Sequence, residues 1–125
     1  MEVKYATSFD ERFNPKSVLE GGPDKFWITT GLYPQELAIE LKKPQPVGSV
    51  RFSATGAKKI EIQGCKDSKG NDFLKLGESK EIANKSSGLQ HEQIQVTEGF
   101  PVTIVKFIIQ EGWDDFVSVH SIEVA

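Results

Sequence analysis

Short runs with large apolar residues at every second position recur along this chain, and they limit the folds open to it. Such runs cover residues 37–41, 50–54, 60–62, 94–96 and 105–109. They are rich in β-branched and aromatic residues, which favour strands. No stretch sustains the 3.6-residue apolar period of an amphipathic helix. The sequence therefore predicts an all-β chain whose strands each have a buried face.

Turn residues separate these runs. Strong turn signals lie at residues 21–24 and 43–46, and polar hairpin tips at 66–72 and 84–88. Composition does not change along the chain, so we expect a single domain over residues 1–125, an antiparallel β-sandwich of the jelly-roll type. The alternation places eight side chains on the inner faces of the sheets: Leu37, Ile39, Phe52, Ile60, Ile62, Val105, Phe107 and Ile109.

The last strand changes its pattern. Val117 and Val119 occupy odd positions, whereas Ile122 and Val124 occupy even ones. A β-bulge near residues 120–121 would swap the faces, because one extra residue reverses the alternation. A strand buried on both faces would explain the same pattern.

Composition excludes several functional classes. The 18 acidic and 15 basic residues give a formal charge of −3, which argues against binding to nucleic acid or anionic lipid. One cysteine, Cys65, allows no internal disulfide and fits a reducing compartment. The N-terminus shows no secretory signal, and the longest apolar stretch, 102–109, is too short to span a bilayer. We expect a soluble intracellular protein with no membrane insertion.

Metal-binding motifs are weak. Residues 67–78 imitate an EF-hand loop, but Lys69 stands at a ligand position and Asp72 where the turn needs glycine. A solvated hairpin is the better interpretation. Cys65, His91 and His120 lack the spacing of a zinc site.

Catalytic motifs are also lacking. The sequence contains no glycine-rich phosphate loop and no nucleophile elbow. Ser118 and His120 share a strand, yet no third group orients them. Asp114 and Asp115 form a carboxylate pair that is more typical of a solvated turn. These patterns predict no catalytic residues and a protein that is not an enzyme.

Two loops with large apolar residues are the candidates for binding. We expect Leu32, Tyr33 and Trp113 to be exposed in a contact surface, because Gly, Pro and Asp neighbours mark them as loop residues. Trp27 is instead predicted to fill the core beneath the Gly21–Gly22 turn. Whether the two loops share one end of the sandwich stays open.

The segment 14–27 resembles the opening of discoidin/galactose-binding-like jelly rolls, with Pro15, a Glu20-Gly21 turn and Trp27. Within that fold, the run from Phe26 to Glu36 (FWITTGLYPQE) is similar to the intraflagellar transport protein 25 family. Residues 115–121 (DFVSVHS) also resemble a segment of that family. The resemblance spans nearly the whole chain.

This resemblance implies a non-enzymatic subunit of intraflagellar transport complex B, located in the cilium or flagellum and the cytoplasm. It implies a heterodimer with a Rab-like small GTPase, intraflagellar transport protein 27, and contacts with other subunits of complex B. Placed on the two loops, the partner-binding residues would be Thr30, Leu32, Tyr33, Gln35, Trp113, Asp115 and Phe116.

The resemblance also implies a calcium site at the positions of Ser17, Glu20 and Lys25. Of these, only Glu20 keeps a carboxylate, and Lys25 could offer only its main-chain carbonyl. Calcium needs several oxygen ligands, so we expect weak binding or none. The alternative function is that of a carbohydrate-binding module, a common role of this fold.

Overall fold

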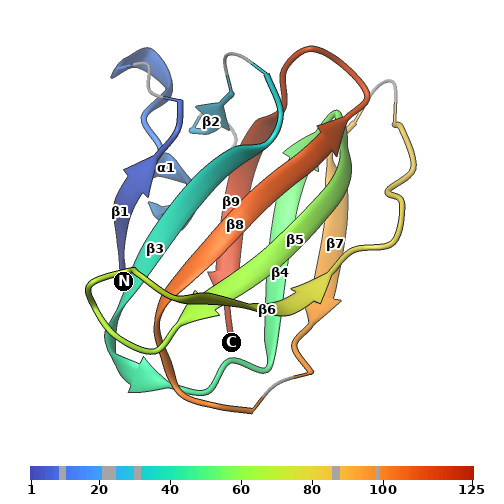
Figure 1. The fold of residues 1–125 in the computed structure, drawn as a ribbon. Coiled ribbons are helices and arrows are strands. Elements are labelled where there is room, and N and C mark those ends of the chain that lie inside the picture. Colours follow the sequence, from blue (N-terminus) through green and yellow to red (C-terminus); the bar gives the residue numbers. More distant parts are fainter. Residues whose placement is uncertain (9–10, 21–24, 30–31, 86–87, 98) are drawn as a thin grey trace.

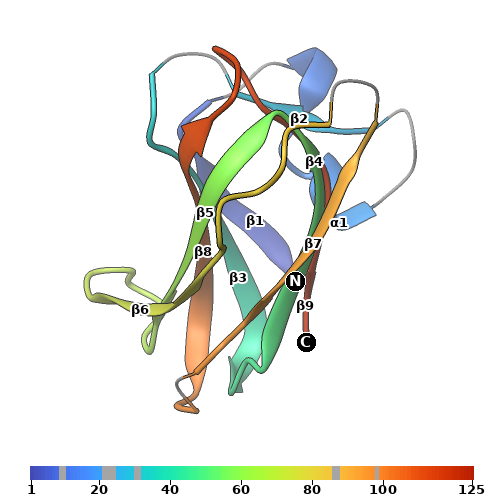
Figure 2. The same ribbon diagram turned by 90° about the vertical axis from the view of Figure 1, so that its right-hand side faces the viewer.

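Two antiparallel β-sheets pack face to face in the computed structural model, which describes residues 1–8, 11–20, 25–29, 32–85, 88–97 and 99–125 (Figure 1 and Figure 2). One sheet has the strand order β1-β3-β8-β5-β6, and the other has the order β2-β9-β4-β7. This confirms the predicted antiparallel sandwich. The elements are β1 (Glu2–Ala6), η1 (Glu11–Phe13), α1 (Ser17–Glu20), β2 (Trp27–Ile28), β3 (Gln35–Gln45), β4 (Ser49–Thr55), β5 (Ala57–Cys65), β6 (Phe73–Glu78), β7 (Gln90–Gln95), β8 (Val102–Gly112) and β9 (Ser118–Val124).

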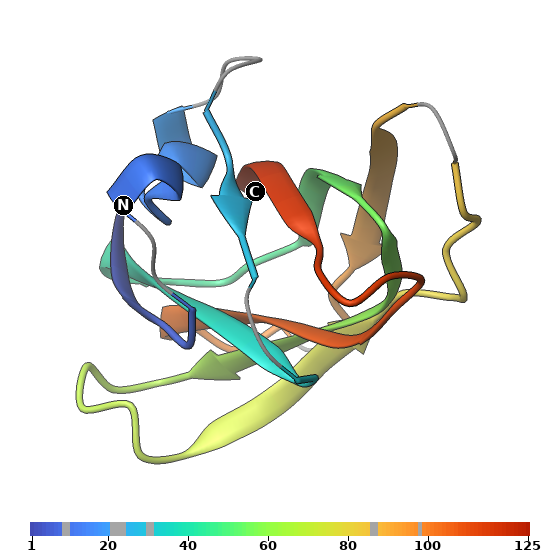
Figure 3. The ribbon, with the colours of Figure 1, turned by 90° about the horizontal axis from the view of Figure 1, so that it is seen from above.

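The core lies between the two layers, which Figure 3 shows end-on. All eight side chains predicted to point inward are no more than 2% exposed. Phe52 of β4 and Phe107 of β8 meet across the layers edge to face, with ring centroids 5.1 Å apart. Such a pair contributes about 0.5–1.5 kcal/mol beyond its buried area, so it helps to fix how the sheets face each other.

Trp27 is fully buried, as predicted. It begins β2, and its indole Nε1 donates a hydrogen bond to the main-chain oxygen of Ser8 at 2.9 Å. The indole ring thus fills the core while its polar N–H group keeps a hydrogen-bond acceptor. The Gly21–Gly22 turn that we expected above it lies outside the described residues.

Strand β9 contains the predicted β-bulge. Ser53 of β4 pairs with Ser121, but the next residue, Ala54, pairs with Val119, so His120 is the extra residue. The two halves of β9 therefore each direct their apolar residues inward, with Val119 and Ile122 both buried. The alternative of a strand buried on both faces is wrong.

A single helical turn precedes β2. The side chain of Asn14 accepts a hydrogen bond from the main-chain N–H of Lys16 at 2.9 Å, so Asn14 caps the turn with Pro15 in the first position. Val18, which is 1% exposed, anchors α1 in the core. No helix in the part of the chain that the structure describes is long and apolar enough to cross a membrane.

The tip between β5 and β6 is a hairpin turn, as expected, and does not form a cation loop. Oδ1 of Asp67 accepts hydrogen bonds from the main-chain N–H groups of Lys69, at 2.9 Å, and Gly70, at 3.2 Å. Gly70 has a φ of 71°, which glycine adopts without strain. The Asp67 carboxylate thus closes the turn on itself.

Candidate interaction site

The two candidate loops meet at the same end of the sandwich (Figure 1). One joins β2 to β3, and the other joins β8 to β9. Thr29 and Val117 tie the loops together twice: the Thr29 N–H donates to the Val117 oxygen, and the Val117 N–H donates to Thr29 Oγ1, both at 2.9 Å. The Tyr33 hydroxyl adds a third bond, to the main-chain oxygen of Asp114 at 2.6 Å. The loops therefore form one continuous surface.

Trp113 is held by two further hydrogen bonds. Its main-chain N–H donates to the Gly56 oxygen at 2.8 Å, and its indole Nε1 donates to the Ile82 oxygen at 2.9 Å. The ammonium group of Lys58 lies 4.7 Å from the ring centroid. The ring is still 38% exposed. Trp113 is thus a fixed, partly open apolar group, which confirms its predicted exposure.

Gln35 lies in the interior, and its side-chain amide holds the main chain of the neighbouring loop in place. It is 7% exposed. Its Nε2 donates to the Leu32 oxygen, and its Oε1 accepts from the hydroxyls of Thr7 and Ser8, each at 2.6 Å. Gln35 was expected among the partner contacts; its amide is buried in the free chain and fixes the main chain of Leu32.

Tyr33 differs from the expectation as well, because it is half-buried and packs against the core. Its pKa is raised, first because burial disfavours the phenolate and then because Asp114 and Asp115 are close. Thr30 lies outside the described residues. The large apolar and acidic residues exposed in the described parts of the two loops are called the loop surface below; they are Leu32, Trp113, Asp114, Asp115 and Phe116.

Large apolar side chains are concentrated on the loop surface. Leu32 is 89% exposed and Phe116 is 52% exposed. With Trp113, they make up half of the large apolar side chains that are exposed among the described residues. Single exposed apolar residues are common, but several on adjoining loops are typical of an interaction site. The arrangement suits binding to another macromolecule.

Gly112 leaves room for Tyr33. A Cβ atom at position 112 would collide with Oη and Cζ of the Tyr33 ring. We expect Gly112→Ala to push the ring outward and break its hydrogen bond to Asp114, which lowers the free energy of unfolding by about 1 kcal/mol. Urea denaturation of a double-mutant cycle with Tyr33→Ala checks this. An equal cost of Gly112→Ala in both backgrounds would show that Tyr33 is not the reason.

One of the residues implied for calcium, Glu20, forms an ion pair with another, Lys25. Oε2 of Glu20 lies 2.8 Å from the ammonium Nζ of Lys25, and both side chains are exposed. This bond to Glu20 raises the pKa of Lys25, so the one carboxylate of the set already faces a cation. No group of three or more His, Cys, Asp or Glu among the described residues could hold a metal.

We therefore keep the expectation of weak calcium binding or none. Calorimetric titration of the chain with calcium measures it directly. A sub-micromolar dissociation constant would contradict the expectation. Weak binding that Glu20→Gln abolishes would place the ion at the implied site.

Ser118 and His120 are hydrogen-bonded to each other on β9. Ser118 Oγ lies 3.0 Å from Nε2 of His120 and also bonds to the hydroxyl of Thr55. A catalytic histidine needs a group that orients its other nitrogen. Nδ1 of His120 is buried and has no hydrogen-bond partner among the described residues. The ring of His120 lies against the ring of Phe26, with centroids 4.9 Å apart and planes tilted by 32°, so the pair is part of the packing around the bulge.

His120 should make the stability depend on pH. Burial lowers its pKa below the ordinary value of 6.5, so the unfolded chain binds more protons than the folded chain as the pH falls below 6.5. Stability from this group is complete above pH 6.5 and is lost as the pH falls toward the folded pKa. We expect wild type to lose more unfolding free energy between pH 7 and pH 5 than His120→Phe. Equal losses in urea denaturation would refute this.

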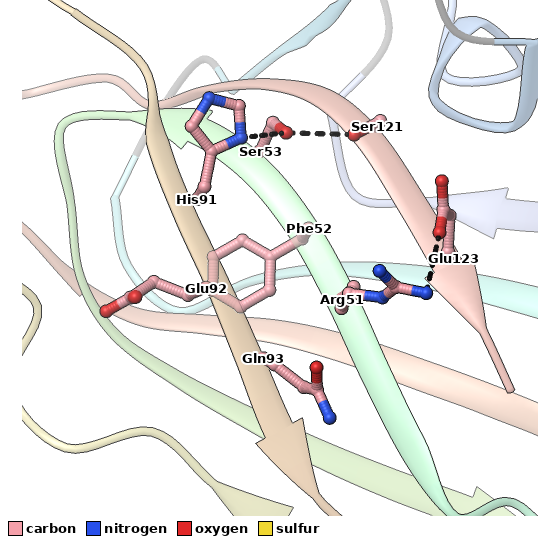
Figure 4. Close-up of a pocket in the computed structure, with 8 residues that line it drawn as sticks. All are labelled: Arg51, Phe52, Ser53, His91, Glu92, Gln93, Ser121 and Glu123. Atoms are coloured by element: carbon pink, nitrogen blue, oxygen red, sulfur yellow. Dashed lines mark hydrogen bonds and ion pairs between the residues drawn. The ribbon is translucent and has the colours of Figure 1, made fainter.

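A polar groove on the outer face of the second sheet was not predicted (Figure 4). His91 Nδ1 lies 3.0 Å from Ser53 Oγ, which accepts from Ser121 Oγ at 3.1 Å. Arg51 and Glu123 are 3.6 Å apart. Of the two aromatic rings among the described lining residues, Phe52 is 2% exposed and belongs to the core, whereas the His91 imidazole is exposed. Five of the seven polar lining residues bond to one another, so few polar groups of the groove are left for a sugar.

Known proteins resemble the chain in both sequence and shape, although no family model matches. The chain is 34% identical to the intraflagellar transport protein 25 homolog of Mus musculus over 97% of this chain and 83% of the mouse protein. It is 33% identical to intraflagellar transport protein 25 of Chlamydomonas reinhardtii over 98% of this chain and 63% of the algal protein.

Among solved structures, chitosan-binding module 1 of a Paenibacillus chitosanase/glucanase matches with a TM-score of 0.82, over 97% of this chain and 92% of that module. The sequence identity is 18%, so this match shows the fold alone. It confirms the galactose-binding-like jelly roll. The sequence matches go further: the chain belongs to the intraflagellar transport protein 25 family.

Proposed function

We propose that the chain is a non-enzymatic subunit of intraflagellar transport complex B and forms a heterodimer with a Rab-like small GTPase. The names of its relatives support a role in intraflagellar transport, and thus in the cilium or flagellum. The observation that carries the proposal is the loop surface, where Leu32, Trp113 and Phe116 are exposed on a rigid frame. Large apolar anchors of this kind usually supply most of the energy of a protein interface.

Hydrogen bonds within the chain already hold the two loops in place, so binding to a partner would immobilise few additional groups. This favours a higher affinity. Thr29, Tyr33 and Trp113 already fix both loops through hydrogen bonds. A preorganised surface loses less conformational entropy on association than a loose one. The rest of the molecule, including the polar groove, is left for other subunits of complex B.

Mixing the chain with the GTPase tests the proposal. We expect size-exclusion chromatography with light scattering to give one particle with the mass of a 1:1 complex. Separate elution of the two proteins at micromolar concentration would contradict the proposal.

Carbohydrate binding is the second candidate, because the shared fold includes a chitosan-binding module. One face of Trp113 is covered by Lys58, which leaves less of the ring for a sugar. A glycan array separates the two candidates: specific glycan binding without GTPase binding would favour the module.

A further inference from the structure

The loop surface combines its apolar groups with two carboxylates. Asp114 and Asp115 are exposed between Trp113 and Phe116. Neither carboxylate forms an ion pair with a described residue. Some exposed carboxylates of this chain are paired, for example Glu78 with Lys75 and Glu123 with Arg51. Among the described residues, Asp114 and Asp115 are unpaired like Glu2 and Glu92, but they alone of these four lie between two exposed aromatic side chains. The apolar anchors therefore lie beside negative charge that the chain does not compensate.

A positive charge that borders the loop surface is already engaged by other groups of the chain. Lys58 lies over the Trp113 ring and 3.8 Å from the carboxylate of Glu81. On the other side, the negative field reaches the half-buried Tyr33 hydroxyl, since both aspartates contribute to its raised pKa. The exposed part of this end is thus acidic as well as apolar.

We infer that the loop surface docks onto a protein surface whose apolar pocket is flanked by lysine or arginine side chains that face Asp114 and Asp115. This inference rests on the proposed function and adds the chemistry of the partner's docking surface. Complementary charge around apolar anchors speeds association and selects the partner. A partner with acidic groups at this place would instead be repelled.

Removing the two charges while keeping the shape is the test. The variant is Asp114→Asn with Asp115→Asn, and the matched control is Glu2→Gln with Glu92→Gln, two exposed carboxylates on other strands. Affinity for the GTPase is measured at rising sodium chloride, with a melting curve for each protein. We expect the aspartate variant to bind about tenfold more weakly at low salt and to lose most of its salt dependence. The control should behave as wild type.

The outcomes distinguish a failure of the charge inference from a failure of the proposed heterodimer. If the aspartate variant keeps wild-type affinity and salt dependence while Leu32→Ala with Phe116→Ala weakens binding, the charge inference is overturned and the heterodimer stands. If the aspartate variant binds more tightly, the facing groups are acidic and the inference is wrong. If wild type does not bind the GTPase, both fail together.

Discussion

Replacing Trp27 with alanine should lower the free energy of unfolding by about 3–5 kcal/mol, the usual cost of deleting a large buried aromatic side chain. Trp27 is fully buried and is among the largest of the fully buried side chains. Its removal opens a cavity between the sheets. It also removes the hydrogen bond from the indole to the main-chain oxygen of Ser8, and losing a buried hydrogen bond adds to the cost.

Urea denaturation measures this effect. Trp27→Phe keeps an aromatic ring but lacks the N–H group, so we expect a smaller loss than for alanine. Trp113→Ala is the control for removing an indole that is partly exposed. If Trp27→Ala unfolds within a few tenths of a kcal/mol of wild type, Trp27 contributes nothing to the core and the assignment is wrong.

The second large effect concerns binding. Leu32→Ala combined with Phe116→Ala should weaken the complex with the GTPase at least a hundredfold, about 2.7 kcal/mol. Both side chains are mainly exposed in the free chain, so their removal should change its melting temperature little. Calorimetric titration measures the affinity. The matched control is Leu74→Ala, which truncates another exposed side chain on β6.

Tyr33 and Trp113 are poorer probes, although the sequence favoured them. Each donates a side-chain hydrogen bond to the main chain of another segment. Their removal would lower stability and binding together. Normal binding by the Leu32 and Phe116 variant would show that the interface lies on another surface, such as a sheet face.

Much of the fold could be predicted from local pattern. The side-chain period of two identified the eight inward residues because a strand alternates its faces strictly. The change of parity between Val119 and Ile122 was enough to locate the bulge, although the pattern alone left a second explanation open. These features depend on neighbours within one strand, which the sequence displays directly.

The candidate site depends on distant neighbours and was predicted only in part. The sequence identified Leu32 and Trp113 as exposed residues, but it did not show that their loops meet. The Tyr33 bond to Asp114 spans 81 residues of chain. Gln35 was placed among the partner contacts because it belongs to the family-like run, and that run does not show that two hydroxyls and one carbonyl satisfy its buried amide.

The polar groove could not be predicted from the sequence for a related reason. Its side chains come from β4, β7 and β9, and only the sheet order places them side by side (Figure 4). Alternate polar residues such as Arg51 and Ser53 marked an outward face in the sequence, but not which strands lie beside it.

Amide hydrogen exchange, with and without the GTPase, tests most directly whether the loop surface is the interface. Exchange is fast in loops with few protected amides and slows when a partner covers them. We predict slower exchange in residues 32–36 and 112–117 of the complex, with little change in β4 and β7. Slower exchange confined to β4 and β7, with both loops unchanged, would contradict the account.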